Sequence, residues 1–221
     1  MRTRQDLIRS AAEAFDEKGF APSSLSEISN RVGVSTGALN FHFRSKRELG
    51  EAVESAAVET MRCIVTMRPM GRPTPLQILV DTTHVLARQL EGDVVFRAGF
   101  GLGNDVTWCA GSAVWGEWQA WVKEILTTAG GAGHLADDLV LDDAWAAVAT
   151  AVAGFEALGR RDAHWRSGQT VTRLWKLLLP RLSSDAVRAE LDASGAGVVT
   201  WADTVDGKAC PAQHGPLAGV G

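Results

Sequence analysis

The chain has 221 residues, of which 46% are hydrophobic and 22% are charged, and its formal net charge is −4. This length suits one large domain, or a small domain joined to a larger one, with a sizeable core. No apolar run approaches the roughly 20 residues that cross a bilayer, and the amphipathic start lacks the apolar block of a signal peptide. We therefore expect a cytoplasmic protein without a membrane partner.

Charge is unevenly distributed along the chain. The first 50 residues hold eight basic and six acidic residues, so this segment is positive although the chain as a whole is acidic. A basic head on an acidic body is a distribution that favours contact between one end and nucleic acid.

Helical periodicity dominates the sequence, and strand signals are almost absent. A first helix is predicted over about 3–18. Ser24 and Glu27 then form a capping box that opens a short second helix, and Gly33 ends that helix because glycine tolerates positive φ. A third helix follows from about 36 to 43, and Ser45 caps a fourth over about 46–67.

Two short helices joined by a glycine-containing turn and packed on a third form a helix-turn-helix. In this arrangement the second helix of the pair lies in the major groove of DNA. At about 100° per residue, one arc of the third predicted helix holds Thr36, Gly37, Asn40 and Phe41. Leu39 and Phe43 lie on the other side, where we expect them to pack on Val32, Val34 and the first helix.

Prolines and glycines at 69–75 interrupt the chain, and more helices are predicted beyond them, at about 76–91, 94–102, 112–129, 139–160, 168–182 and 184–192. The fold class is therefore all-α. We expect a helix-turn-helix domain over 1–45, a helical domain over 46–192, and a glycine-rich, flexible tail over 193–221.

The segment SSLSEISNRVGVSTGALNFHFRSKRELGEAV resembles the N-terminal domain of TetR-family transcriptional regulators, and the likeness covers about residues 3–55. The resemblance implies a homodimer that binds double-stranded operator DNA. It places Thr36, Gly37, Asn40 and Phe41 at the DNA surface, and it puts phosphate-contacting positions at Ser23, Ser24, His42 and Lys46. From the residues alone, His42 is equally consistent with a satisfied core histidine. For Lys46, phosphate contact is favoured over a merely solvated side chain.

Two residues depart from this family's common pattern. Thr36 stands where the family commonly has Lys, which removes a sequence-independent attraction to phosphate. Asn40 stands where it commonly has Tyr, and its amide can pair with the edge of adenine. We therefore expect an unusual operator preference.

A row of tryptophans stands in the body of the chain. Trp115, Trp118 and Trp121 recur at a spacing of three, among small residues that leave room for a ligand. The same spacing is equally typical of a packed core, and the residues alone do not decide between the two.

The segments GDVVFRAGFGL and GEWQAW resemble the γ-butyrolactone-receptor branch of TetR-type repressors. The resemblance implies that Trp118 covers a small apolar ligand, of γ-butyrolactone type, that releases the repressor from genes of antibiotic or secondary metabolism. The nearby candidates for ligand contact are Trp115, Trp121, Phe96 and Phe100. An antibiotic or drug as the ligand, with efflux or biosynthesis as the target, is the alternative.

The helices over about 139–160 and 168–182 lie where the family builds its four-helix dimer interface. The first is rich in alanine and glycine, which permits close helix approach. The candidate dimerisation residues recur at helical spacing, and for each of them an internal core position is the competing interpretation: Trp145, Val152, Phe155, Leu174, Trp175 and Leu178.

Motifs for enzymatic chemistry are missing, so we expect no catalytic residue and no cofactor, and a small-molecule hydrolase or carrier is disfavoured. His134, Asp137 and Asp138 could ligate a metal, but a polar loop whose aspartates cap the next helix is preferred, and no metal is expected. Cys63, Cys109 and Cys210 are odd in number and far apart, which favours free thiols.

Overall fold

The computed structural model describes residues 2–67, 73–108 and 110–195, and this part of the chain is helical throughout. Its one β-type pairing is an isolated bridge between Leu135 and Ser183. The predicted all-α class is therefore confirmed. Among the described helices, none is both long and apolar enough to cross a membrane.

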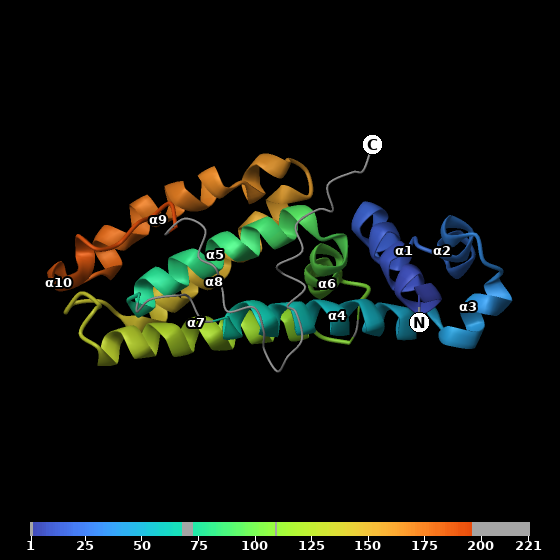
Figure 1. Ribbon diagram of the computed structural model, residues 1–221, viewed down its shortest axis with the longest axis horizontal. Helices are drawn as coiled ribbons and strands as arrows, with labels where there is room; N and C mark the ends of the chain where they lie inside the picture. The colour runs from blue at the N-terminus through green and yellow to red at the C-terminus, as the bar shows by residue number, and fades with distance from the viewer. Residues whose placement is uncertain (1, 68–72, 109, 196–221) are drawn as a thin grey trace. The chain divides into compact units, whose positions relative to one another are not determined.

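Three helices form the N-terminal head: α1 (Arg2–Lys18), α2 (Leu25–Val32) and α3 (Thr36–His42) (Figure 1). Ser24 caps α2 by accepting a hydrogen bond from the Glu27 N–H, and Gly33 ends α2 with a φ of 73°. Both features were predicted from the sequence. A left-handed residue at this point turns the chain sharply between α2 and α3, as a helix-turn-helix requires.

The chain divides into two compact units, and the division differs from the expected boundary after residue 45. Unit 1 comprises Met1–Met61 with Asp93–Gly116, and unit 2 comprises Arg62–Gly92 with Glu117–Gly221. Unit 1 therefore contains most of α4 (Lys46–Thr66) and all of α6 (Val94–Asn104).

Close packing explains why α6 belongs to unit 1. It packs extensively on α1, and Arg97 of α6 forms an ion pair with Asp16 of α1 at 2.8 Å. Gly99 lies so close to Ala57 of α4 that an added Cβ would overlap the alanine methyl. Because α6 follows α1 by some 80 residues, helix periodicity alone does not reveal this contact.

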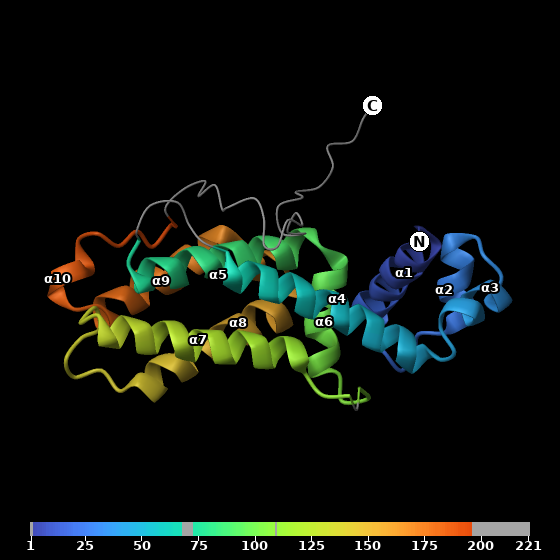
Figure 2. The same cartoon turned by 60° about the horizontal axis from the view of Figure 1, so that its bottom comes forward.

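Unit 2 contains α5 (Pro75–Gly92), α8 (Leu141–Gly159), a 3₁₀ turn η1 (Ala163–Arg166), α9 (Gly168–Leu182), the short α10 (Asp185–Arg188) and most of α7 (Ala113–Gly131). Helix α5 is buried over nearly its whole length and packs against α9, η1 and α8. Figure 2 shows α5 beside α9 from a second direction.

The residues that follow α10 are held on α5. The main-chain N–H of Asp192 donates to Gln77 Oε1 at 2.8 Å, and the carbonyl oxygen of Ala193 lies 3.1 Å from His84 Nε2. The sequence assigned residues 193–195 to the flexible tail. In the structure, the contact between the Ala193 carbonyl and His84 holds the start of this segment on α5. The rest of the predicted tail, 196–221, lies outside the described residues.

Two minor sequence predictions are wrong. Cys63 is disulfide-bonded rather than free. The sequence could not predict this bond, because a disulfide requires proximity in space, which sequence spacing does not reveal. Cys109 and Cys210 lie outside the described residues. Helix α8 has no side-chain cap at its start, and Asp138 pairs with Arg181 at 2.8 Å instead.

Candidate functional site

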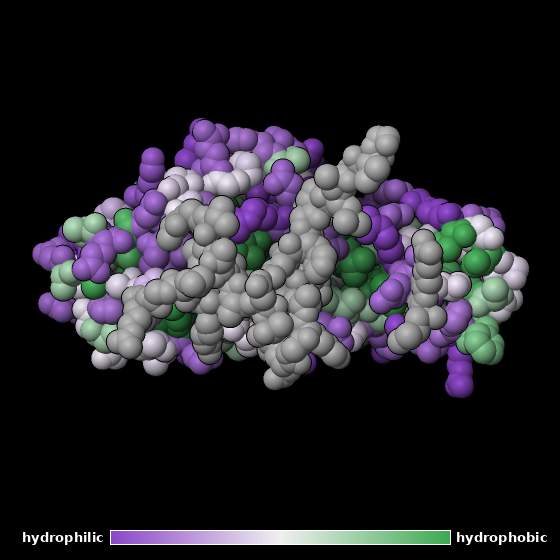
Figure 3. Space-filling view, in the orientation of Figure 1, coloured by the Kyte–Doolittle hydropathy of each residue, from purple (hydrophilic) through white to green (hydrophobic). Residues whose placement is uncertain are grey.

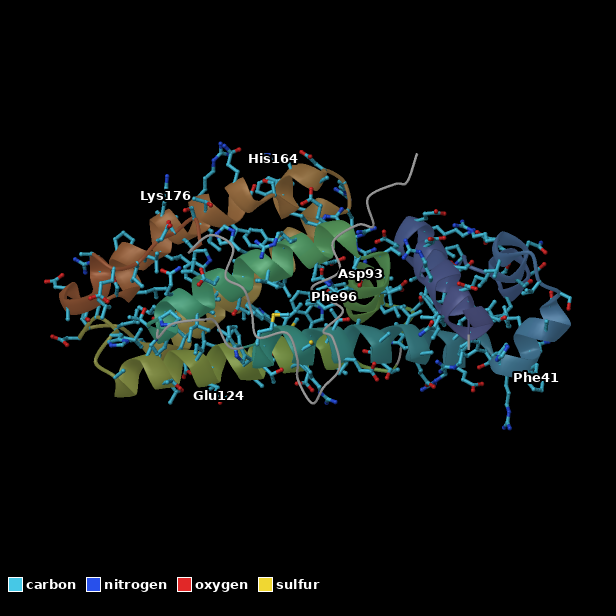
Figure 4. The ribbon with its side chains drawn as sticks, viewed as in Figure 1. Phe41, Asp93, Phe96, Glu124, His164 and Lys176 are labelled. Carbon is cyan, nitrogen blue, oxygen red and sulfur yellow. The ribbon has the colours of Figure 1, made fainter. Side chains whose placement is uncertain are left out.

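The outward face of α3 contains the four residues that the sequence placed there, and Ala38 is exposed as well. Thr36, Gly37, Asn40 and Phe41 are all exposed, and the Phe41 side chain is 87% exposed. Figure 4 shows Phe41 on α3, and Figure 3 shows apolar surface on the head. An exposed aromatic ring between polar neighbours is suited to contact a partner rather than a core.

The inward face of α3 anchors the helix. Leu39 and Phe43 are almost completely buried in a cluster with α1, α2 and α4, and Val32 and Val34 pack against the same cluster. Ser35 caps the start of α3 by accepting from the Ala38 N–H at 3.1 Å. The two phenylalanines therefore have different environments although they are two residues apart.

Lys46, the first residue of α4, is bound within the protein. Its ammonium donates hydrogen bonds of 2.9 Å to the carbonyl oxygens of Phe20, Ala21 and Ser23, and it lies 4.5 Å from the centre of the Phe20 ring. An ammonium group has three N–H donors, so all three have acceptors in the loop between α1 and α2.

The other expected phosphate-contacting residues differ in accessibility. Ser23 is buried, and its hydroxyl lies within hydrogen-bond distance of the carbonyl oxygens of Ala14 and Gly19. Ser24 is exposed, although its hydroxyl caps α2. His42 is half-buried, and its ring packs edge-on to Phe41 with centroids 5.4 Å apart. Ser24 and His42 are therefore accessible to a partner, whereas the Ser23 side chain is not.

The loop between α1 and α2 is also tied to the end of α6. Asp105 Oδ2 accepts a hydrogen bond of 2.7 Å from the Phe20 N–H, and the Phe20 ring packs on Trp108 and Phe15. The Asp105-x-Thr107 spacing is a local turn signal, but nothing in the sequence identifies Phe20 as its partner.

Carboxylates neutralise several basic residues of the head. Arg31 donates to Glu17 and Glu27, and Lys18 donates to Glu27 at 2.5 Å. The Arg31 hydrogen bond lowers the pKa of Glu17, and chiefly the Lys18 hydrogen bond lowers the pKa of Glu27, below the ordinary 4.5. A lowered carboxyl pKa stabilises the fold above its unfolded-state value, so these pairs persist at neutral pH and are lost as the pH falls through the lowered values.

The five candidate ligand residues fall into two groups. In unit 1, the Phe100 ring packs edge-on to Phe96 and Trp115, at 5.0 Å and 4.6 Å. In unit 2, Trp118 and Trp121 lie 5.5 Å apart. Trp118 is completely buried, and its indole N–H has no hydrogen-bond partner in the described part of the chain, a property that it shares with Trp108, Trp115 and Trp175. A buried donor without a partner costs about 1–3 kcal/mol, which an acceptor atom of a ligand would offset.

The candidate dimerisation residues are largely buried within one chain. Val152, Phe155 and Trp175 belong to the core of unit 2. Trp145 is half-buried and donates from its indole N–H to the Gln119 carbonyl at 3.0 Å. Leu174 and Leu178 are half-buried, and between them Leu177 is 76% exposed. Sequence periodicity marked these positions as apolar but did not separate the inner face of each helix from its outer face.

Within the described residues, no group of three or more His, Cys, Asp or Glu side chains could hold a metal ion. The carboxylate of Asp138, one of the residues considered for such a site, forms an ion pair with Arg181.

The contrast between the two phenylalanines of α3 predicts opposite stabilities for two matched variants. Phe43→Ala removes a buried ring and should lower the free energy of unfolding by about 3–5 kcal/mol. Phe41→Ala removes an exposed ring and should change it by less than about 0.5 kcal/mol. Urea unfolding followed by circular dichroism measures both, and equal losses would contradict the assigned orientation of α3.

Comparison with known proteins agrees with this geometry. A family model described as bacterial regulatory proteins, tetR family, matches residues 7–53. Over 203 residues the chain is 29% identical to the A-factor receptor protein of Streptomyces griseus, which covers 88% of this chain and 69% of that protein. The match therefore extends well beyond the head.

Solved structures give the same result. A γ-butyrolactone receptor described as ArpA-like superposes with a TM-score of 0.75 at 25% identity, over 87% of this chain and 95% of that one. CprB of Streptomyces coelicolor, solved in complex with its biological operator sequence, has a TM-score of 0.72 at 25% identity, over 86% and 92%. The matched proteins are regulators and receptors, not enzymes. The N-terminal head therefore matches the tetR family of bacterial regulatory proteins, and the chain is similar, through both of its units, to γ-butyrolactone receptors.

Proposed function

We propose that this protein is a homodimeric transcriptional repressor that a small apolar ligand releases from operator DNA. The observation that carries the proposal is the outward face of α3, where Phe41 is 87% exposed on a helix that Leu39 and Phe43 hold in place. A rigid short helix with an exposed, mixed polar and aromatic face is what insertion into a major groove requires.

Each residue of the outward face has a role that its chemistry supports. The Asn40 amide donates and accepts at once, so it can pair with N6 and N7 of adenine. Phe41 offers an apolar contact for a thymine methyl group. Thr36 and Gly37, at the start of α3, allow the helix to approach the base edges closely. Ser24 and His42 are accessible, and they are the candidates for phosphate contact beside this face.

The surface of unit 2 supports self-association through α8 and α9. Leu177 is 76% exposed on α9, between the half-buried Leu174 and Leu178. On α8, small side chains recur at spacings of three and four on an accessible face, which allows a second helix to pack closely: Ala146, Ala147, Thr150, Gly154 and Ala157. Four helices, two from each protomer, would bury these surfaces.

Trp118 supports a ligand that carries an acceptor oxygen. Its ring supplies apolar surface, and its buried N–H needs an acceptor that the described residues do not provide. A lactone offers a ring and carbonyl oxygen of this kind. Release from DNA requires that the ligand bind better to the conformation that does not fit the operator.

An antibiotic or drug that regulates its own efflux or biosynthesis is the alternative ligand class. It would use the same aromatic residues, and large aromatic side chains bind many apolar rings without a specific hydrogen bond. The Trp118 N–H favours the oxygen-bearing ligand, because an apolar drug would leave that donor unsatisfied.

The reading role of Asn40 predicts a change in sequence preference. Duplexes that bind the wild type can be recovered from a random pool, and their affinities measured by fluorescence anisotropy. Asn40→Ala should weaken binding to them by about 5- to 150-fold, corresponding to about 1–3 kcal/mol for one base contact, and should change which sequences bind best.

Asn30→Ala is the matched control, because Asn30 is also exposed but lies on α2. It should bind the recovered duplexes as the wild type does. If Asn40→Ala weakened binding equally for every sequence in the pool, Asn40 would not read bases. If the wild type bound no duplex at all, the proposed DNA-binding function would be wrong.

The Trp118 N–H predicts a graded loss of ligand response. An alkyl-substituted γ-butyrolactone, titrated into the protein–DNA complex, should release the wild type. Trp118→Phe keeps an aromatic ring but removes the donor, so release should need about two to ten times more lactone, the effect of one hydrogen bond. Trp165→Phe, at an exposed tryptophan, is the control, and an equal shift in both variants would refute the role of Trp118.

A further inference from the structure

The basic residues of the head differ in whether they already form an ion pair or hydrogen bonds within the protein. Most of the described ones have an internal partner at short distance: Arg9 with Glu13 at 3.4 Å, Lys18 with Glu27 at 2.5 Å, Arg31 with Glu17 at 2.6 Å, Arg47 with Glu51 at 3.0 Å, and Lys46 with three main-chain carbonyls. To bind a phosphate group with full strength, each of these would have to give up that partner.

Two arginines of the described head are exceptions. Arg4 and Arg44 are both exposed, and neither guanidinium has a hydrogen-bond or carboxylate partner among the described residues. Their shared neighbour is Phe43: the Arg4 guanidinium carbon lies 5.2 Å from the centre of the Phe43 ring, and Arg44 follows Phe43 in the chain. The carboxylate of Glu48 is nearby, but it accepts from the main-chain N–H of Arg44 at 2.7 Å.

We propose that Arg4 and Arg44, rather than Lys46, form the phosphate-binding pair of this head. The inference rests on the proposed DNA-binding function and names the contacts that attach α3 to the nucleic acid. Phe43 ends α3, so the two guanidinium groups flank the end of the helix whose outward face carries Asn40 and Phe41. Their phosphodiester contacts would fix that face in the groove.

The chemistry of both groups fits the ligand. A guanidinium presents a planar set of N–H donors that binds two oxygens of one phosphate group, and it is weakly hydrated. Because neither arginine has an ion pair with any described residue, DNA binding need not break one. The Arg4 guanidinium over the Phe43 ring keeps its orientation by a cation–π contact that leaves its N–H donors free.

Lys46 has the opposite arrangement. Moving its ammonium to a phosphate group would remove the donor of the Ala21 and Ser23 carbonyls, and would leave the Phe20 carbonyl with only the Ser23 N–H at 3.3 Å. Lys46 is therefore a positioning residue. It holds the loop between α1 and α2, and through that loop the orientation of the helices that follow.

Salt dependence of DNA binding distinguishes these roles. Each phosphate contact contributes about 0.9 to the slope of log K against log salt. The probe is a fluorescently labelled duplex of random sequence, which binds mainly through phosphates, measured by anisotropy over a range of KCl concentrations. Arg4→Gln and Arg44→Gln should each lower the slope by about 0.9 per head that contacts the duplex.

Two further variants complete the experiment. Arg9→Gln removes the same charge from a paired position on α1 and should leave the slope unchanged. Lys46→Met should also leave the slope unchanged but should lower the thermal midpoint of unfolding, and failure of this variant to fold would support the positioning role equally.

The outcomes that overturn the inference are specific. Slopes for Arg4→Gln and Arg44→Gln that equal the slope of Arg9→Gln would show that these arginines bind no phosphate. A Lys46→Met variant with unchanged thermal stability and a slope lowered by about 0.9 per head would show that Lys46 binds phosphate. Wild-type protein without salt-dependent duplex binding would refute the proposed function itself, independently of which cation is involved.

Discussion

The ammonium group of Lys46 is the contact on which the geometry of the head depends. It joins the start of α4 to three main-chain carbonyl groups of the loop between α1 and α2. The same loop receives the Asp105 carboxylate from the end of α6 and places the Phe20 ring on Trp108. The Lys46 ammonium satisfies these main-chain carbonyls as hydrogen-bond acceptors. It thereby holds the loop between α1 and α2 in one conformation, although the loop has no regular secondary structure.

This loop explains why unit 1 includes more than the helix-turn-helix. The loop between α1 and α2 has partners from both α4 and α6, and the Arg97–Asp16 ion pair attaches α6 to α1 a second time. A movement of α6 would therefore be transmitted to α1 and α4 together. Helices α1, α4 and α6 of unit 1 are therefore held to one another by named contacts.

Local patterns predicted the helices of the head well. The Ser24 cap, the Gly33 turn and the opposite orientations of Leu39 and Phe41 depend on neighbours within four residues, and each was correct. The contacts that position these helices join residues far apart in the chain. The partners Asp16 and Arg97, or Phe20 and Asp105, are more than 80 residues apart, and no periodicity reports such a pairing.

The same limit applies to the body. Periodicity marks Val152 and Trp175 as apolar positions of helices, but it does not distinguish a surface that packs within one chain from a surface that packs between two. The structure buries both residues within unit 2 and exposes Leu177. The resemblance to a family likewise suggested a phosphate role for Lys46, whereas the carbonyls that occupy it are visible only in the fold.

Photo-crosslinking from the outward face of α3 tests the central claim most directly. A photoreactive benzoyl group on the ring at position 41 should crosslink to duplex DNA recovered with the wild type, because the Phe41 ring is exposed and would lie against the bases. The same group at the exposed Trp165 of unit 2 should give no crosslink. Crosslinks from position 165 without any from position 41 would contradict the assignment of α3 as the DNA-reading helix.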